Sequence, residues 1–272
     1  MIQIKAPFIF AAQLAKKVID DDLLALSNEL AYKILLSIFP FMIFLVTLLG
    51  FLNLESSAFV LRLFEQLPAD ISIVFIDFIS EVQERPSTGL LSISLLISIY
   101  SSSNGFKAVI RGVNKAHGYK DHRNFVTKTA LCIALMLIFT FSIITMLVLW
   151  VFSDAIIAGL TTVIPFNINI VVKFFYTAIA FVMLVGVTAL MYYLACARHG
   201  KGKTLPGACA TVILWAISSN VFAIFVSQFS NISIIYGSIA GVFILIIWLN
   251  LIAFFLLLGN SVNALLNENS PK

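Results

Sequence analysis

The chain has 272 residues, of which 61% are hydrophobic and only 11% charged, and its formal net charge is +4. Soluble domains have roughly 25% charged residues, so a globule this apolar could not cover its surface with polar groups. The composition excludes an ordinary soluble fold and predicts a membrane protein.

The first residues do not have the pattern of a cleavable secretory signal. The short apolar stretch 6–15 runs directly into Lys16, Lys17 and the acidic triplet 20–22, whereas a signal ends in a cleavage site of small residues. Apolar residues recur at helical spacing at Phe8, Ala12, Ala15, Ile19, Leu23 and Leu26. Residues 1–28 are therefore predicted to form an amphipathic helix on the membrane surface.

Six apolar stretches are long enough to cross a bilayer, which requires about 20 helical residues. They cover residues 30–53, 89–110, 129–152, 170–195, 205–228 and 232–260. The polar run 101–105 interrupts the second stretch, and the last is long enough to tilt or project from the membrane. We expect an all-α fold with a single domain, 1–272. It is a polytopic membrane helix bundle of six transmembrane helices plus interfacial amphipathic helices.

Basic residues are distributed unequally between the two sets of loops. Most of them flank the first span, follow the second and fourth spans, or end the chain: Lys5, Lys16, Lys17, Lys33, Lys107, Arg111, Lys115, Lys120, Arg123, Lys128, Arg198, Lys201, Lys203 and Lys272. Of the 17 Lys and Arg residues, Arg62, Arg85 and Lys173 fall on the other side. Because Lys and Arg concentrate in cytoplasmic loops, both termini are expected in the cytoplasm.

The connection between the first two spans, residues 54–88, is predicted to form amphipathic helices on the periplasmic side. Four carboxylates after Pro68 recur at helical spacing and make one acidic stripe: Asp70, Asp77, Glu81 and Glu84. In the centre of a bilayer each would cost roughly 2–3 kcal/mol, so a further span is disfavoured here. The stripe is either a solvated face or a docking surface for an envelope partner.

The sequence has no arrangement of side chains typical of an enzyme. A hydrolase or nuclease needs clustered metal ligands or paired carboxylates that face a common point. His117, His122 and His199 lie on basic loops, with Asp121 as the nearby carboxylate, and have no metal-binding spacing. The cysteines, scattered in or beside apolar runs, are Cys132, Cys196 and Cys209. We expect no catalytic residues, no metal and no cofactor.

Polar side chains within the apolar stretches are the candidate functional residues, since an unsatisfied polar group in hydrocarbon costs several kcal/mol. They either form interhelical hydrogen bonds or line a polar cavity that accepts a headgroup or solute. Lys107 and Arg111 share a helix face, where they either set topology or contact lipid phosphate at about 1 kcal/mol per charge. The proposed lipid-binding or cavity residues are Asn104, Lys107, Arg111, Asn220, Tyr236 and Asn250.

Further patterns concern packing. Glu29 and Lys33 are four residues apart, the spacing at which opposite charges pair along a helix. Gly237 and Gly241 have the Gly-x-x-x-Gly spacing that lets two helix backbones approach closely. Pro206 predicts the first turn of a helix.

Three blocks of the sequence carry a family pattern that extends over nearly the whole chain. They are LAYKILLSIFPFMIFL (30–45), SSSNGFKAVIRGVNKAHGYKDHRNF (101–125) and segment 205–266, with Pro-Gly, Tyr-Gly-Ser, Trp-Leu and Leu-Gly-x-x-x-Asn-Ala elements. These blocks resemble the YihY/BrkB family of bacterial inner-membrane proteins. In one departure, Ser261 stands where many members have glutamate, so a role for that carboxylate does not carry over.

The resemblance implies a role in the cell envelope. Members have carried the label ribonuclease BN, for transfer-RNA processing, and one is a virulence factor. The sequence has no metal-binding spacing that would support the ribonuclease label. The expected function is handling phospholipid or helping its export at the bacterial inner membrane. The partners implied are membrane phospholipids and a periplasm-spanning lipid-transfer protein; no nucleic acid is expected, and homo-oligomerisation is left open. The alternatives are a non-transporting membrane scaffold for an envelope partner, a small-solute transporter and a membrane-bound ribonuclease.

Overall fold

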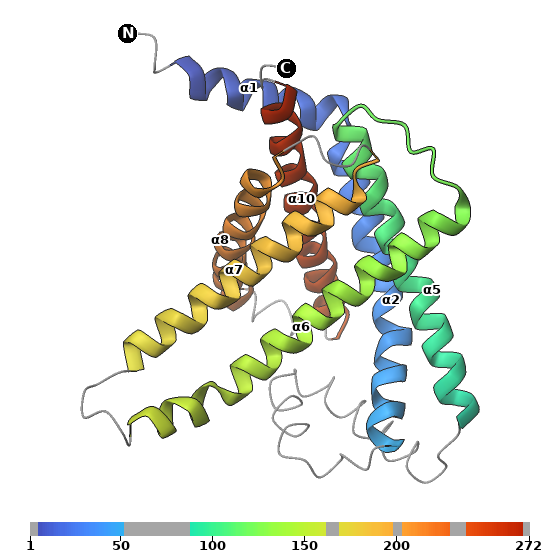
Figure 1. Ribbon diagram of the computed structural model, residues 1–272, viewed down its shortest axis with the longest axis vertical. Coiled ribbons are helices and arrows are strands. Elements are labelled where there is room, and N and C mark those ends of the chain that lie inside the picture. Colours follow the sequence, from blue (N-terminus) through green and yellow to red (C-terminus); the bar gives the residue numbers. More distant parts are fainter. Residues whose placement is uncertain (1–4, 52–87, 162–168, 198–202, 229–237, 269–272) are drawn as a thin grey trace.

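All regular elements in the described part of the chain are α-helices. The computed structural model describes residues 5–51, 88–161, 169–197, 203–228 and 238–268. Its helices, labelled as in Figure 1, are α1 (Lys5–Asp20), α2 (Leu23–Phe51), α5 (Thr88–Ala116), α6 (Phe125–Thr161), α7 (Asn169–Ala195), α8 (Leu205–Gln228) and α10 (Ser238–Glu268). The expectation of an all-α protein is confirmed for these residues.

In its described residues, each of the six stretches predicted to span a membrane is helical. Four helices contain apolar windows long enough to cross a bilayer: Phe125–Ser142, Thr177–Ala195, Leu205–Val226 and Phe243–Glu268. For α2 and α5, which have 29 residues each, membrane crossing stays a prediction. The polar run 101–105 does not break α5, because the helix continues from Thr88 to Ala116. The predicted periplasmic segment 54–88 lies outside the described residues except for its end.

The predicted surface helix over 1–28 is divided in two. α1 ends at Asp20, and Asp22 has a φ of 52°, in the left-handed region that Asp adopts more readily than most residues. The Leu26 amide then donates to the Asp22 carbonyl at 3.0 Å, which begins the next helix. Residues 23–28 therefore belong to α2, and α1 lies across one end of the bundle (Figure 1).

The helices form a bundle around α10. α10 packs against α8 and α2, contacts α5 and meets α1 at its final turns. α2 and α5 run side by side and share the most extensive helix contact, while α6 and α7 form a second pair that leans across the bundle (Figure 1). Fully buried residues where these helices meet include Ile110, Val113, Ala195, Ala208 and Ala253.

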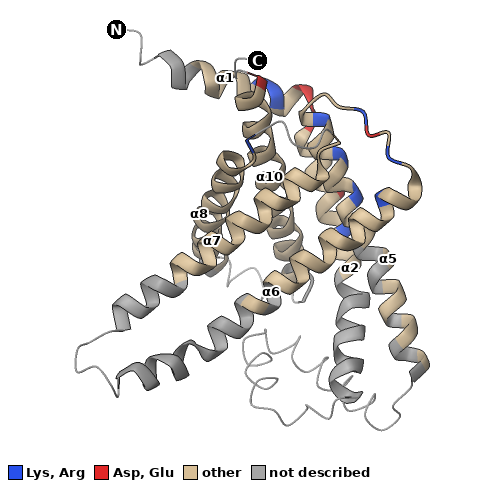
Figure 2. Ribbon diagram, in the orientation of Figure 1, with Lys and Arg blue, Asp and Glu red and all other residues tan. Residues whose placement is uncertain are grey.

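Charged side chains gather at one end of the bundle, which we call the basic end. In Figure 2 the coloured Lys, Arg, Asp and Glu residues lie around α1, the start of α2, the end of α5 and the end of α10. The first and last described helices meet here, since Lys17 of α1 forms an ion pair of 3.2 Å with Glu268 of α10. The helices nearest the two ends of the chain therefore meet on the side of the basic loops, and the cytoplasmic location of this side stays a prediction.

Buried amides join the helices at the basic end, as the interhelical interpretation predicts. Asn114 of α5 donates to the Ala195 carbonyl at the end of α7 (3.0 Å) and accepts from the Ala197 amide (2.6 Å). Asn263 of α10 accepts from the Gly207 amide (2.6 Å) and donates to the Thr204 carbonyl (3.0 Å) at the start of α8. Two of the bonded groups, the Ala195 carbonyl and the Gly207 amide, are helix-end groups of the kind that have no partner within their own helix.

Arg123 performs a similar role from the loop between α5 and α6. Its guanidinium donates to the carbonyls of Leu194 (3.1 Å), Ala195 (3.1 Å) and Cys196 (2.7 Å). A cation at these carbonyls also faces the negative end of the helix dipole of α7. The basic loop is therefore bound to α7 by a charge as well as by hydrogen bonds.

α8 and α10 approach each other closely at Gly207 and Gly259. A Cβ atom on Gly207 would collide with the Gly259 carbonyl and the Asn263 amide, and one on Gly259 with the Thr211 hydroxyl. By contrast, a Cβ on Gly241 would meet nothing within 4 Å, so the close contact expected from Gly-x-x-x-Gly is not found there; Gly237 lies outside the described residues. Pro206 lies in the first turn of α8, as predicted.

We predict that Gly259→Ala destabilises the purified protein in detergent, whereas Gly241→Ala does not. The added methyl group at position 259 overpacks the α8–α10 contact, at a cost of roughly 1–3 kcal/mol. At position 241 the methyl group has space, and alanine favours a helix by roughly 0.5–1 kcal/mol. Thermal unfolding followed by intrinsic fluorescence would measure both effects. Equal unfolding midpoints for the two variants would contradict the packing argument.

Candidate functional site

Three basic residues follow one another at four-residue intervals along the last turns of α5: Lys107, Arg111 and Lys115. This spacing places them on one side of the helix. Arg111 Nη1 lies 3.0 Å from Glu29 Oε2, and Lys115 Nζ lies 3.1 Å from Asp22 Oδ2. Two of the three charges are therefore paired with carboxylates at the start of α2.

Lys107 has neutral partners instead. Its Nζ donates to Asn104 Oδ1 at 3.1 Å and lies 5.9 Å and 5.7 Å from the ring centroids of Tyr100 and Phe125. No ion pair between described residues includes Lys107. A cation over an exposed ring gains about 0.5–1 kcal/mol, but the rings carry no net negative charge. Within the described chain, the Lys107 charge is thus not neutralised by an anion.

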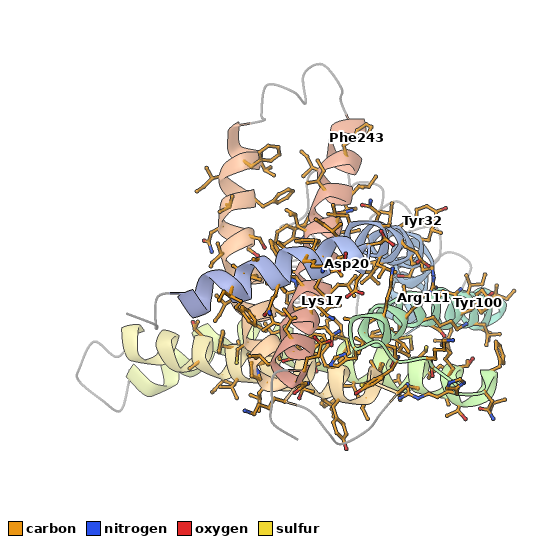
Figure 3. All side chains as sticks on the ribbon, turned by 90° about the horizontal axis from the view of Figure 1, so that it is seen from above. Lys17, Asp20, Tyr32, Tyr100, Arg111 and Phe243 are labelled. Atoms are coloured by element: carbon orange, nitrogen blue, oxygen red, sulfur yellow. The ribbon has the colours of Figure 1, made fainter. Side chains whose placement is uncertain are left out.

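An exposed apolar strip continues from Lys107 along α5 away from the basic end. Tyr100 is 68% exposed and Leu96 66% exposed, and Ile93 and Ile97 are also exposed. Because residues three or four apart share a helix face, these residues lie in line with Lys107. We call the set Ile93, Leu96, Ile97, Tyr100, Asn104 and Lys107 the α5 face. Figure 3 shows Tyr100 and Arg111 on the same side of the molecule.

The α5 face has the length and polarity of one bilayer leaflet. At about 1.5 Å per residue, the helix from Ile93 to Lys107 covers about 21 Å. One leaflet with its headgroups is roughly 20 Å thick. The strip is aliphatic at one end, aromatic at Tyr100 and cationic at Lys107, with Phe125 of α6 beside the cation. This is the order in which a phospholipid presents acyl chains, glycerol region and phosphate.

Glu29 of α2 connects the cations beside this face. Glu29 Oε1 lies 2.5 Å from Lys33 Nζ, and Glu29 Oε2 lies 3.0 Å from Arg111 Nη1. The Glu29–Lys33 pair was expected from the spacing, whereas the bond to Arg111 joins residues 82 positions apart in the chain. One carboxylate therefore neutralises part of two basic charges.

The proposed cavity residues do not all come together. Asn104, Lys107 and Arg111 lie close to one another on α5, and Asn250 of α10 forms a hydrogen bond with Asn28, the neighbour of Glu29. Asn220 is exposed on α8, and its Nδ2 donates to the Ala216 carbonyl of its own helix. Tyr236 and the predicted docking stripe lie outside the described residues; the stripe comprises Asp70, Asp77, Glu81 and Glu84.

Sequence reasoning missed the two aromatic residues at Lys107. Tyr100 lies one turn before Asn104, so helical spacing could have identified it. Phe125 comes from the start of α6 and reaches Lys107 only through the packing of α5 against α6. Ser261, at the position of the family glutamate, is fully buried and donates to the Leu257 carbonyl at 3.1 Å; it has no part in the α5 face.

Asp121, the carboxylate considered for a nuclease, contributes to the structure of the basic loop. Asp121 forms an ion pair of 2.8 Å with Lys128, and its Oδ1 accepts from the Arg123 amide at 3.2 Å. Burial alone would raise the Asp121 pKa, but these hydrogen bonds and positive charges lower it below its usual range. Among the described residues, no group of three or more His, Cys, Asp and Glu side chains could hold a metal ion.

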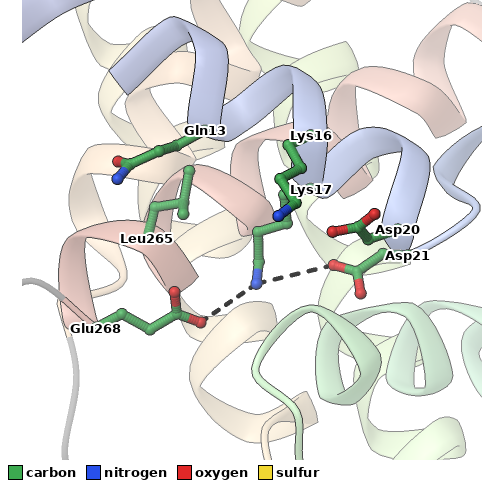
Figure 4. Close-up of a pocket in the computed structure, with 7 residues that line it drawn as sticks. All are labelled: Gln13, Lys16, Lys17, Asp20, Asp21, Leu265 and Glu268. Atoms are coloured by element: carbon green, nitrogen blue, oxygen red, sulfur yellow. Dashed lines mark hydrogen bonds and ion pairs between the residues drawn. The ribbon is translucent and has the colours of Figure 1, made fainter. Parts of the chain in front are cut away.

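A cavity of about 320 Å³ lies between α1 and the end of α10 (Figure 4). Lys17 forms ion pairs across it, 3.2 Å from Glu268 and 3.9 Å from Asp21. The lining residues are Gln13, Lys16, Lys17, Asp20, Asp21, Leu265 and Glu268. The lining has three carboxylates against two lysines, so this cavity has no excess of positive charge, in contrast to the surroundings of Lys107.

Comparison with known proteins places this geometry in a family. A family model described as Virulence factor BrkB matches residues 14–272, which include all the described helices except the beginning of α1. The chain belongs to the BrkB family. The family expected from the three sequence blocks is confirmed.

Relatives of this BrkB-family protein include proteins from Bacillus subtilis and two Vibrio species. It is 32% identical over 246 residues, 89% of each chain, to the putative ribonuclease-like protein YfkH of Bacillus subtilis. Proteins named UPF0761 membrane protein from Vibrio parahaemolyticus and Vibrio campbellii are 39% and 36% identical over 62 residues. That shared segment is 23% of this chain and 20% of each Vibrio protein. No solved structure matches the chain. With its apolar helices, the protein is a membrane protein of this family.

We predict that His117 makes stability depend on pH. His117 Nδ1 lies 3.0 Å from the Val113 carbonyl, and burial lowers its pKa although this hydrogen bond raises it. Lys17, Asp21 and Glu268 also act on its charge. In the unfolded chain the imidazole of His117 binds a proton near pH 6.5, whereas in the folded chain it binds one only at lower pH. Stability is therefore complete above about pH 6.5 and falls below it.

The unfolding midpoint should be measured for the wild type and for His117→Gln between about pH 7.5 and 5.5, on either side of the unfolded histidine pKa. The variant should lose part of the acid-side decrease, while the same substitution at His122, which is exposed, should leave it intact. If the His117 variant and the wild type lose stability equally below pH 6.5, burial of this imidazole does not couple to folding.

Proposed function

We propose that this BrkB-family protein is a bacterial inner-membrane protein that binds a phospholipid along the α5 face and assists its export for envelope homeostasis. In this proposal it has six spans and both termini in the cytoplasm. The observation that carries the proposal is Lys107, a partly buried cation whose described partners are an amide and two aromatic rings.

The Lys107 ammonium group is the proposed ligand of the lipid phosphate. Asn104 Oδ1 orients the ammonium group at 3.1 Å, and an ammonium group has three donors, so further donors can reach phosphate oxygens. A basic group at the headgroup level gains about 1 kcal/mol from anionic lipid. The phosphate would supply the negative charge that the described residues do not provide to Lys107.

The exposed aromatic and aliphatic side chains beside Lys107 support the same placement of the lipid. Tyr100 and Phe125 are highly exposed, and aromatic rings are enriched at the membrane–water interface. Farther along α5, Leu96 and Ile93 present aliphatic surface on which an acyl chain can lie. Because the basic end is expected in the cytoplasm, the bound lipid would come from the inner leaflet. Transfer to a periplasm-spanning partner is the final step of this proposal.

We predict that Lys107→Gln lowers phospholipid binding about fivefold, because loss of about 1 kcal/mol corresponds to that factor. Binding is measured by native mass spectrometry of the detergent-purified protein titrated with phosphatidylglycerol. Lys120→Gln is the matched control. It removes the same charge from the same basic end, at an exposed lysine of the loop after α5. Equal binding by the wild type and the Lys107 variant would overturn the proposed lipid site.

A further inference from the structure

The neighbourhood of the α5 face has more positive than negative charge. Lys107 and Arg111 come from α5 and Lys33 from α2, while the carboxylate that contacts this group is Glu29, which pairs with both Lys33 and Arg111. A second carboxylate that pairs with α5 is Asp22, just before α2, and it contacts Lys115 at 3.1 Å. In the described structure, positive charge therefore remains in excess around Lys107.

Arg111 can contribute to a ligand at Lys107 without leaving Glu29. Its side chain is 53% exposed, and its hydrogen bond to Glu29 uses Nη1. A guanidinium group has five N–H donors, so donors remain for a second oxygen of the same phosphate. Lys107 and Arg111 are one helical turn apart, a separation of about 6 Å between their Cβ atoms. Their long side chains can converge on one phosphate group.

We infer that the α5 face selects phospholipids of net negative charge over zwitterionic phospholipids that carry an amine. This inference rests on the lipid site of the proposed function and names its substrate class. A phosphate would meet Lys107 and Arg111, which attract it. A headgroup ammonium would need an acceptor, but Glu29 already accepts from Lys33 and Arg111. The ammonium group would then lie among like charges.

Glu29 sets the strength of this selection. Its carboxylate lies 3.0 Å from Arg111, so it reduces the attraction that Arg111 exerts on an anionic headgroup. Its negative charge also offsets part of the repulsion that a headgroup amine would meet from Lys33 and Arg111. Removing its charge strengthens the binding of anionic lipid and weakens that of amine-bearing lipid. Removing the Arg111 charge has the opposite effect on the ratio of bound anionic lipid to bound amine-bearing lipid.

The test is competition between two lipids on the purified full-length protein. Phosphatidylglycerol and phosphatidylethanolamine with identical acyl chains are added in equal amounts, and the bound ratio is measured by native mass spectrometry. The wild type should bind phosphatidylglycerol about tenfold more. Glu29→Gln should raise the ratio several-fold and Arg111→Gln should lower it several-fold. Asp22→Asn, which removes a carboxylate of the Lys115 ion pair farther along α5, should leave the ratio unchanged.

Opposite changes in the ratio separate selectivity from a loss of folding, since a structural defect would lower both lipids together. A ratio near one in the wild type, with binding still dependent on Lys107, would overturn the selectivity and leave the lipid site standing. Binding of neither lipid at Lys107 would overturn the proposed function itself. Soluble sn-glycerol 3-phosphate is the further competitor. Its failure to displace the lipid supports a lipid ligand, whereas displacement at equal concentration would assign the site to free phosphate and overturn both.

Discussion

Close approach of α8 and α10 at Gly207 and Gly259 is the contact on which the rest of the arrangement depends. Lipid is as apolar as the side chains that face it, so helices in a membrane associate through close packing and hydrogen bonds rather than through hydrophobicity. A collision between Gly259 and Thr211 would follow from any side chain at position 259. α10 also contacts α2, α5 and α1. The place of α10 against α8 therefore influences the position of each of these helices.

The polar groups of the basic end fall into two sets, buried amides that join the helices and cations that lie nearer the surface. Asn114 and Asn263 are almost completely buried and bind backbone groups at the ends of α7 and α8. Buried amides without such partners would cost about 1–3 kcal/mol each. Lys107 and Arg111 lie nearer the surface, where their donors can reach a ligand. The amides that join the helices are thus different residues from the cations proposed to contact a ligand, although α5 contributes to both sets.

The relation between Glu29 and the two basic residues it contacts gives the α5 face its chemical character. A carboxylate paired with each cation would leave a neutral surface with little preference among headgroups. Here Glu29 is shared between Lys33 and Arg111, and Lys107 contacts neutral groups. The net positive charge lies at one end of a strip of exposed apolar side chains on α5. Charge and apolar length together match an anionic lipid more closely than a soluble anion.

The sequence by itself determined the helical membrane class, the limits of α7 and α8, the concentration of basic residues at one end and the family. These properties depend on composition and on neighbours three or four residues apart, as with Glu29 and Lys33. The tertiary structure decided that Glu29 also binds Arg111, that Phe125 lies over Lys107 and that the close glycine contact is at Gly259. Each of these joins separate helices, and their contact depends on how the helices rotate and cross, which local spacing does not specify.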